Sequence, residues 1–340
     1  MSYTRSGFGA AVVGEKIYVF GGVGEEGYCI TTEQYDPVED VWITKASIPS
    51  HRSHFGVAVC EDKIYCIGGQ YIKNYYFREQ STGINEVYDP ATDSWKTLAP
   101  MPTPQLSIQA NAVNGKIYVI GGYINDTFAS DLNQVYDPKS NSWSTQTPIP
   151  IGVCDYTSAV VGNKIYVFSN NLTQIYDTYH DSWSIGATAP LPVIMGSAVT
   201  INGSDGSKLI FVFGANTMPW VNSTTKELTT QCYNPETDSW TNGASVPTCR
   251  YHAAAANINE TIYVIGGFTT PISGGQISYV NCAVNEQYTP LNFDLDATAV
   301  STQNSGYSFD MTFWLLFLLL IILAVAIGIM VYWKKRKQRG

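Results

Sequence analysis

The sequence predicts an all-β protein built from six copies of one antiparallel unit, because two patterns occur together along it. The first is a β-branched and aromatic run that ends in a glycine pair, as in KIYVIGG at 116–122. The second follows about fifteen residues later and is a Tyr-Asp-Pro turn with a tryptophan behind it, as in 136–143. Such runs are typical of strands, and glycines end them where the backbone needs conformational freedom.

Both patterns recur at a regular spacing. The first returns at 17–22, 64–69, 165–170, 209–215 and 262–267, and the second at Tyr35, Tyr88, Tyr176, Tyr233 and Tyr288. Successive tyrosines lie 53, 48, 40, 57 and 55 residues apart, which suits a four-stranded propeller blade. The fourth copy has Ser169-Asn170 in place of the glycine pair, so we expect blade four to be the least regular.

These glycine, tyrosine and tryptophan positions resemble the kelch repeat over about residues 1–290. The resemblance implies a six-bladed kelch-type β-propeller, which we place at 1–295 and whose strands we name A to D from the axis outwards. Because the four strands are antiparallel, the A–B and C–D turns share one face. The B–C and D–A loops share the other, which we call the loop face.

Composition argues against one class of partner. All 28 acidic residues lie at or before Asp310, where 14 of the 19 basic residues also lie, so this part of the chain carries 14 − 28 = −14. A body this acidic disfavours a nucleic-acid backbone as ligand.

The loop face carries the candidate binding residues. Long loops on a rigid scaffold commonly carry function, and aromatic and arginine side chains are typical of binding hot spots. The alternative is that these side chains fold back over the blade edges. The predicted binding residues are Arg52, Tyr71, Tyr75, Tyr76, Phe77, Trp220 and Arg250. We expect the ligand to be a protein or a carbohydrate.

Catalytic chemistry has weaker support. Kelch propellers include copper-radical oxidases, which use two His and two Tyr ligands, and sialic-acid epimerases. This chain has four histidines, of which His54 and His252 hold equivalent positions on blades two and six. A metal between them is geometrically allowed, but polar residues at the head of strand A also serve to anchor loops. We therefore predict no metal, no cofactor and no catalytic residue, with a sugar-acting enzyme as the alternative.

Five Asn-x-Ser/Thr sequons fall in predicted turns or loops, where a glycan could be attached. They are Asn125, Asn171, Asn202, Asn222 and Asn259. The seven cysteines are odd in number, so at least one is unpaired within the chain, and their positions favour no particular disulfide.

After the repeats the sequence changes character. Residues 296–310 form a polar stalk, and 311–333 contain 23 residues without a charge, enough for one transmembrane helix. The tail, 334–340, holds five Lys or Arg and no acid. The positive-inside rule places this tail in the cytoplasm and the propeller on the extracellular or lumenal side of a single-pass membrane protein.

Two absences bear on the N-terminus. Residues 1–6 do not resemble a signal peptide, and no tryptophan follows Tyr288 to mark strand D of blade six. The favoured hypothesis is that the natural N-terminus is missing and would supply both a signal peptide and that strand. The alternative is that 291–295 supplies the strand.

These features predict a cell-surface binding module that presents its loop face to a protein or glycan. Besides the membrane-tethered enzyme that acts on sugars, a structural surface-coat protein is the third hypothesis.

Overall fold

The structure is a computed structural model. It describes residues 1–72, 79–124, 128–203, 205–215, 228–244, 248, 250–273 and 276–288. The chain divides into two units, 1–294 and 295–340, and every described residue belongs to the first. The predicted stalk, transmembrane segment and tail lie outside the described residues. Within the described ranges, no helix has the length and apolar character that a membrane crossing requires.

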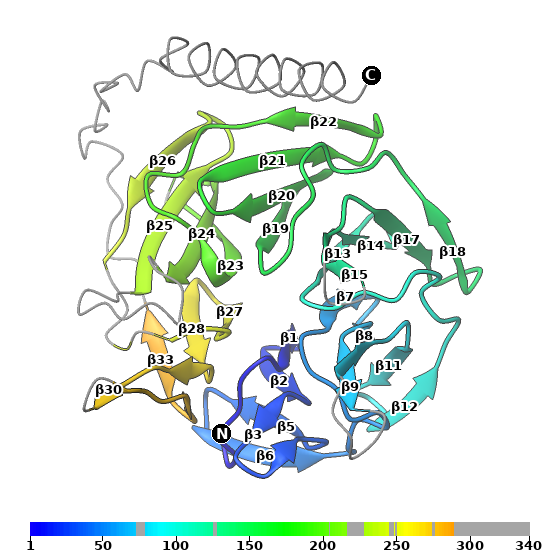
Figure 1. Ribbon diagram of the computed structural model, residues 1–340, viewed down its shortest axis with the longest axis vertical. Helices are drawn as coiled ribbons and strands as arrows, with labels where there is room; N and C mark the ends of the chain where they lie inside the picture. Colours follow the sequence, from blue (N-terminus) through cyan, green and yellow to red (C-terminus); the bar gives the residue numbers. More distant parts are fainter. Residues whose placement is uncertain are drawn as a thin grey trace, which may run out of the picture. The chain divides into compact units, whose positions relative to one another are not determined.

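Six antiparallel sheets surround a central axis and follow the chain in order (Figure 1). Five of them have four strands. These are β1 (Gly9–Val13), β2 (Lys16–Phe20), β5 (Thr32–Asp36) and β6 (Val41–Lys45) in blade one; β7 (Gly56–Cys60), β8 (Lys63–Ile67), β11 (Asn85–Asp89) and β12 (Ser94–Thr97) in blade two; β13 (Gln109–Val113), β14 (Lys116–Ile120), β17 (Asn133–Asp137) and β18 (Ser142–Thr145) in blade three; β19 (Thr157–Val161), β20 (Lys164–Ser169), β21 (Leu172–Asp177) and β22 (Ser182–Ile185) in blade four; and β23 (Ile194–Asn202), β24 (Lys208–Ala215), β25 (Leu228–Asn234) and β26 (Ser239–Asn242) in blade five.

Blade six contributes three strands within the described residues: β27 (Ala254–Ile258), β28 (Thr261–Ile265) and β33 (Asn285–Tyr288). The ring closes at its inner edge, because β1 packs against both β7 and β27. The prediction of a six-bladed all-β propeller is therefore confirmed. Residues 291–295, the local candidate for a fourth strand in blade six, lie outside the described residues.

Strand sequences explain the radial order of each blade. Strand A is rich in Gly, Ala and Ser because the six inner strands crowd the axis, and a Cβ added at Gly56 would come within 2.9 Å of Ala110 in the next blade. Strand B is buried on both faces between neighbouring blades, and Ile117, Val119 and Ile120 of β14 have no exposed surface. A strand that packs on both faces favours such a continuous apolar run over strict alternation.

The turn between the repeat tyrosine and its tryptophan joins each of blades two to five to the preceding blade. In blade two, Asp93 Oδ1 accepts hydrogen bonds from Tyr88 Oη at 2.6 Å and from the backbone N–H of Ala46 in blade one at 2.9 Å. The indole of Trp95 donates to Ala46 O at 2.8 Å. Asn141, Asp181 and Asp238 repeat this arrangement in blades three, four and five. The repeated motif thus produces an inter-blade joint.

Blade four is not the least regular blade, contrary to the prediction from its sequence. Asn170 replaces the second glycine of the pair and adopts φ 52°, a left-handed conformation that asparagine tolerates better than most residues. All four strands pair in continuous register. The irregularity lies in blade five instead, where the register of β23 shifts between Ile194 and Ser197.

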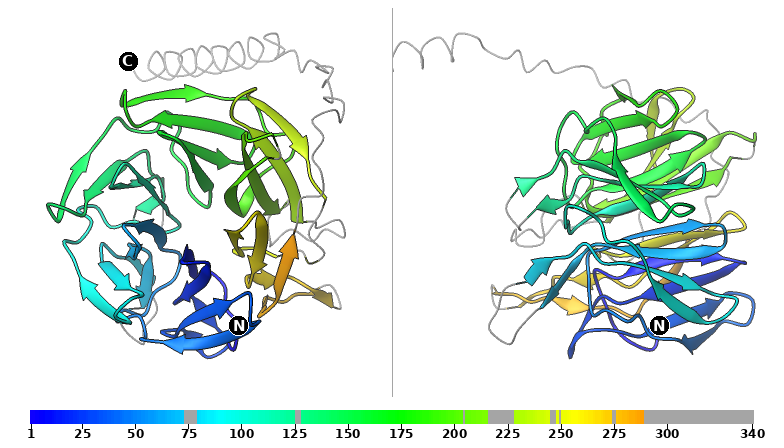
Figure 2. Two further views of the ribbon diagram at one scale, coloured as in Figure 1. Left: turned by 180° about the vertical axis from the view of Figure 1, so that it is seen from behind. Right: turned by 90° about the vertical axis from the view of Figure 1, so that its right-hand side faces the viewer.

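Short hairpins extend from the B–C connections onto the loop face. Blades two, three and six extend theirs beyond the same side of the ring in the side view of Figure 2. The hairpins are β3 (Val23–Gly24) with β4 (Gly27–Tyr28), β9 (Gln70–Ile72) with β10 (Glu79–Ser81), β15 (Tyr123–Ile124) with β16 (Phe128–Ala129), and, in blade six, β29 (Phe268–Thr269) with β32 (Val280–Asn281) and β30 (Ile272–Ser273) with β31 (Gln276–Ile277).

Candidate functional site: the axial ring and its pocket

One residue from each blade lies at the start of the inner strand, where the D–A segment reaches the axis on the loop face: two positions before the strand in five blades, and as the second residue of β23 in blade five. We call these six residues the axial ring: Gly7, His54, Ser107, Asp155, Met195 and His252. All six have left-handed backbones, with φ between 48° and 59°. Five of them are not glycine, and backbone strain of this kind in non-glycine residues clusters at functional sites.

The preceding residue fixes each ring position in four of the blades. Ser6, Ser53, Leu106 and Tyr251 each form an isolated antiparallel bridge with the residue that follows the glycine pair of the same blade. Their bridge partners are Val23, Gln70, Tyr123 and Phe268, the first residues of the loop-face hairpins in those blades. The axial ring is therefore tied to the base of the hairpins.

Backbone hydrogen bonds also link the ring residues to one another. The N–H of His54 donates to Gly7 O at 2.7 Å, and the N–H of Ser107 donates to His54 O at 2.9 Å. On the other side of the axis, the N–H of Met195 donates to Asp155 O at 3.2 Å, and the N–H of His252 donates to Met195 O at 3.0 Å. These bonds hold the left-handed backbones in place and leave the side chains free to define the centre.

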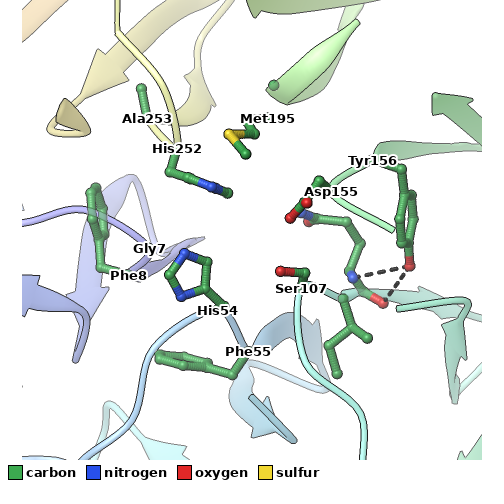
Figure 3. A pocket seen from close by; sticks show the side chains of 13 residues that line it. Gly7, Phe8, His54, Phe55, Ser107, Asp155, Tyr156, Met195, His252 and Ala253 are labelled. Carbon is green, nitrogen blue, oxygen red and sulfur yellow. Dashed lines mark hydrogen bonds between the residues drawn. The ribbon is translucent and has the colours of Figure 1, made fainter. Parts of the chain in front are cut away.

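The side chains of the axial ring surround a pocket of about 70 Å³ (Figure 3). His54, His252, Asp155 and Ser107 point toward its centre from four different blades. A second cavity of about 200 Å³ shares Phe8, Phe55, Gln109, Gly196 and Ala253 with the pocket and is lined by the small residues of the inner strands. The pocket thus leads from the loop face into the central channel.

The two histidines of the ring meet at the axis. Their imidazole rings lie edge to face with centroids 4.7 Å apart. Burial lowers the pKa of His54 to about 3, with a further lowering from nearby His252, and burial lowers the pKa of His252 to about 4. Gly7 makes room for this pair, since a Cβ there would come within 2.7 Å of the His54 ring. At neutral pH both imidazoles are therefore uncharged.

Asp155 brings a carboxylate to the same pocket. Its Oδ2 accepts a hydrogen bond from Tyr123 Oη at 3.3 Å, which links the blade-three hairpin to the ring. Burial and the contacts with Cys154 and Asp155 raise the pKa of Tyr123.

Across the part of the chain that the structure describes, no group of three or more His, Cys, Asp or Glu side chains could hold a metal ion.

A run of aromatic rings connects the pocket with the surface of blade six. His252 lies 6.0 Å from Phe268, and Phe268 lies 5.5 Å from Tyr279, measured between ring centroids. Tyr279 is 59% exposed near the hairpin of blade six. Together with the His54–His252 contact, this run extends from the axis to the loop-face surface.

The structure corrects two of the predicted binding residues, Arg52 and Arg250. Both are fully buried, and they pair with Glu86 and Glu286 on strand C at 2.8 and 2.5 Å. Arg52 also donates to the carbonyls of Gly68 at 3.1 Å and Ile84 at 2.9 Å. These arginines satisfy backbone carbonyls beside the glycine pair and the neighbouring loop, so they stabilise blades and do not present a surface to a partner.

Of the other predicted binding residues, the structure describes only Tyr71. Tyr71 lies in β9 of the blade-two hairpin and is partly exposed. Tyr75, Tyr76, Phe77 and Trp220 lie outside the described residues, so their role stays a prediction. The prediction did not include Asp155, Ser107 and Met195. Aligning the six repeats and comparing the equivalent residues at the start of each strand A would have found them.

Three of the five sequon asparagines lie in the described residues. Asn202 and Asn259 are exposed near the A–B turns, whereas Asn171 is partly buried and donates to Ala189 O at 2.7 Å. Asn125 and Asn222 lie outside the described residues. All six cysteines in the described part of the chain are free: Cys29, Cys60, Cys66, Cys154, Cys232 and Cys282.

Comparisons with known proteins agree with this architecture. The model of the Attractin/LZTR1 β-propeller family matches residues 64–280, and the kelch motif matches residues 4–49. The solved structure of YjhT superposes with a TM-score of 0.65 at 18% identity, over 84% of this chain and 95% of that chain, and it supports the fold alone.

Curated relatives share parts of the chain. Beta-scruin of Limulus polyphemus is 28% identical over 36% of this chain and 14% of its own length. The kelch-like protein terF of Aspergillus terreus is 30% identical over 38% of this chain and 30% of its own length. Human kelch repeat and BTB domain-containing protein 12 is 30% identical over 36% of this chain and 13% of its own length. The chain thus spans less than a third of each of these relatives. With the family model covering well over half of its residues, the chain belongs to the Attractin/LZTR1 β-propeller family of kelch-repeat proteins.

Proposed function

We propose that this chain is a membrane-anchored interaction module that binds a protein partner on its loop face. Kelch-type propellers generally mediate protein interactions, and this chain has their repeats. The observation that carries the proposal is the continuous run from exposed Tyr279 through Phe268 and His252 to His54 at the axis. An aromatic surface beside a pocket is typical of an interface that anchors a few central side chains.

The charge state of the pocket favours binding over acid–base catalysis. A general acid or base works best when its pKa lies near the working pH. Burial places the pKa of His54 at about 3 and that of His252 at about 4, well below neutrality. The membrane anchor and the extracellular or lumenal side of the propeller are part of the proposal and rest on 311–333 and the basic tail.

Matched surface variants of the full chain test the proposal. Phe128, which is 75% exposed, and Tyr279 lie on loop-face hairpins, whereas Val38 and Tyr179 lie in C–D turns on the opposite face and are 80% and 78% exposed. Each variant is expressed on intact cells, and neighbouring proteins are identified by proximity labelling. We expect Phe128→Ala with Tyr279→Ala to lose specific partners that Val38→Ala with Tyr179→Ala keeps.

Two outcomes would contradict the proposal. Identical sets of labelled proteins for both double variants would show that the loop face does not select partners. A propeller that resists protease added to intact cells, while the tail is cut, would place the propeller in the cytoplasm.

A further inference from the structure

We infer that the axial pocket receives one basic side chain, lysine or arginine, from a loop of the protein partner. This inference rests on the proposed function and names the chemistry of the contact at its centre. Four observations support it. They are the charge of the residues that line the pocket, the hydrogen bonds that the backbone N–H groups of the axial ring already make, the shape of the channel, and the net negative charge of residues 1–310.

The lining of the pocket carries negative charge and hydrogen-bond acceptors. Among the described residues that line the pocket and the channel below it, Asp155 is the only Asp, Glu, Lys or Arg. His54 Nδ1 lies 2.9 Å from Ser53 Oγ, and in the tautomer whose Nδ1–H donates to Ser53 the Nε2 atom is an acceptor. Ser107 offers hydroxyl lone pairs. A cation in this pocket would find a carboxylate and several acceptors, which a buried charge requires.

The backbone of the axial ring argues against an acidic ligand. Anion sites in loops use backbone N–H groups that point into a concavity. Here the N–H groups of His54, Ser107, Met195 and His252 are already donated to carbonyls of neighbouring ring residues. The carboxylate of Asp155 would in addition repel an anion, so a glutamate or aspartate side chain is a poor fit.

The shape of the cavity favours a slender group. The pocket of about 70 Å³ continues into the channel of about 200 Å³, where Gly9, Ala110 and Ala254 are among the small lining residues. An extended aliphatic stem with a charged end can pass the ring and lie along such walls, as lysine and arginine stems do on apolar surfaces. The charge of −14 carried by residues 1–310 would attract a basic loop to the protein.

Histidine-selective NMR on the full chain in nanodiscs tests the inference, because the chain has only four histidines. The probe is the capped pentapeptide Gly-Gly-Arg-Gly-Gly, and the matched probe replaces arginine with uncharged citrulline. We expect saturable shifts of the His54 and His252 signals with the arginine peptide and none with citrulline. Raising the salt concentration should weaken binding, because the attraction is electrostatic.

Two substitutions that each remove one negative charge distinguish binding in the pocket from the attraction exerted by the whole acidic protein. Asp155→Asn removes the carboxylate and keeps a residue that tolerates its φ of 49°. We expect it to weaken binding of the arginine peptide about 10- to 100-fold, the range for a lost charge-assisted hydrogen bond. Glu25→Gln, at an exposed position in the blade-one hairpin, should leave the affinity unchanged.

Several results would overturn the inference. They are equal binding of the arginine and citrulline peptides, tighter binding of a glutamate peptide, an Asp155→Asn variant with wild-type affinity, or histidine signals that respond to Zn²⁺ alone. The peptide comparison uses the unmodified chain, so it decides the matter even if Asp155→Asn does not fold. If the loop-face variant loses its partners while Asp155→Asn keeps them, the proposed function stands and this inference fails.

Discussion

Arg52 and Glu86 form an ion pair of 2.8 Å in which the side chains are 0% and 3% exposed. The pair joins the D–A segment to strand C of blade two, and Ser50 Oγ donates to the second carboxylate oxygen at 2.7 Å. Arg5–Glu33 and Arg250–Glu286 repeat the pair in blades one and six, whereas blade three has Gln105 and Gln134 at these positions. The chain therefore contains both an ionic and an uncharged form of one contact.

Arg52→Gln should lower the free energy of unfolding by about 3–5 kcal/mol, because it leaves the Glu86 carboxylate buried without its cation. The double variant Arg52→Gln with Glu86→Gln reproduces the blade-three contact and should recover most of that loss. Denaturant unfolding of both single variants and the double variant gives the coupling energy. This account would be contradicted if the changes in unfolding free energy of the two single variants sum to that of the double variant.

An exposed ion pair provides the control. Lys63 and Asp89 lie 3.4 Å apart with side chains 49% and 29% exposed. Because solvent screens such a pair, Lys63→Gln should change the free energy of unfolding by about 1 kcal/mol or less.

Asp93→Ala should destabilise the joint between blades one and two, since Asp93 accepts from both Tyr88 Oη and the Ala46 N–H. We expect a loss of about 1–3 kcal/mol for the unsatisfied donors, with backbone strain added at φ 47°. Asp93→Asn should be nearly neutral, because asparagine stands at the same place in blade three. Thermal unfolding compares the two, and equal losses would show that this oxygen does not act through its hydrogen bonds.

The His54–His252 pair should make stability depend on pH between about 6.5 and about 4. In the unfolded chain a histidine takes up its proton near pH 6.5, whereas in the fold the pKa values are about 3 and about 4. The unfolded state therefore binds more protons in this window, and the free energy of unfolding falls as the pH falls, with a limiting slope of about 1.4 kcal/mol per pH unit for each histidine.

The variant His54→Asn with His252→Asn isolates this effect from the carboxylates, and asparagine tolerates the left-handed backbone at both sites. Its unfolding free energy should depend less steeply on pH than that of the wild type. Parallel pH profiles would show that the two imidazoles do not resist protonation.

Glycan attachment tests the sidedness of the propeller. If the propeller is lumenal, Asn202 and Asn259 should carry glycans, because both are exposed near the A–B turns. Mass spectrometry of glycosidase-treated peptides measures the occupancy. Unmodified asparagine at all five sequons in a cell that glycosylates its secreted proteins would favour a cytoplasmic propeller.

Local sequence patterns could predict the sheets because each blade repeats the same short-range chemistry. The glycine pair ends strand B, and the tyrosine, turn acid and tryptophan form one joint, so spacing alone identifies the blades. The same reasoning was wrong for Arg52 and Arg250. An arginine in a loop suggests exposure, but its partner Glu86 lies 34 residues away and becomes visible only when the repeats are compared with each other.

The candidate site could be predicted only in part, because it forms from six segments that are distant in the chain. Sequence comparison put His54 and His252 at equivalent positions, but it could not show that their rings meet across the axis. Nothing local to Ser107, Asp155 or Met195 marks it as a ring residue, since the left-handed backbone arises from bonds to neighbouring blades.

In the axial ring, main-chain atoms hold the blades together and side chains determine the chemistry of the pocket. Main-chain hydrogen bonds between blades hold the backbone conformation of the ring, and none of the six residues belongs to the buried apolar clusters that pack the sheets. Glycine, histidine, serine, aspartate and methionine already occupy equivalent positions in one molecule. A lineage could therefore change ligand preference by substitution at the five positions other than Gly7 while the blades stay as they are, and specificity in related propellers should diverge faster at the axis than in the sheets.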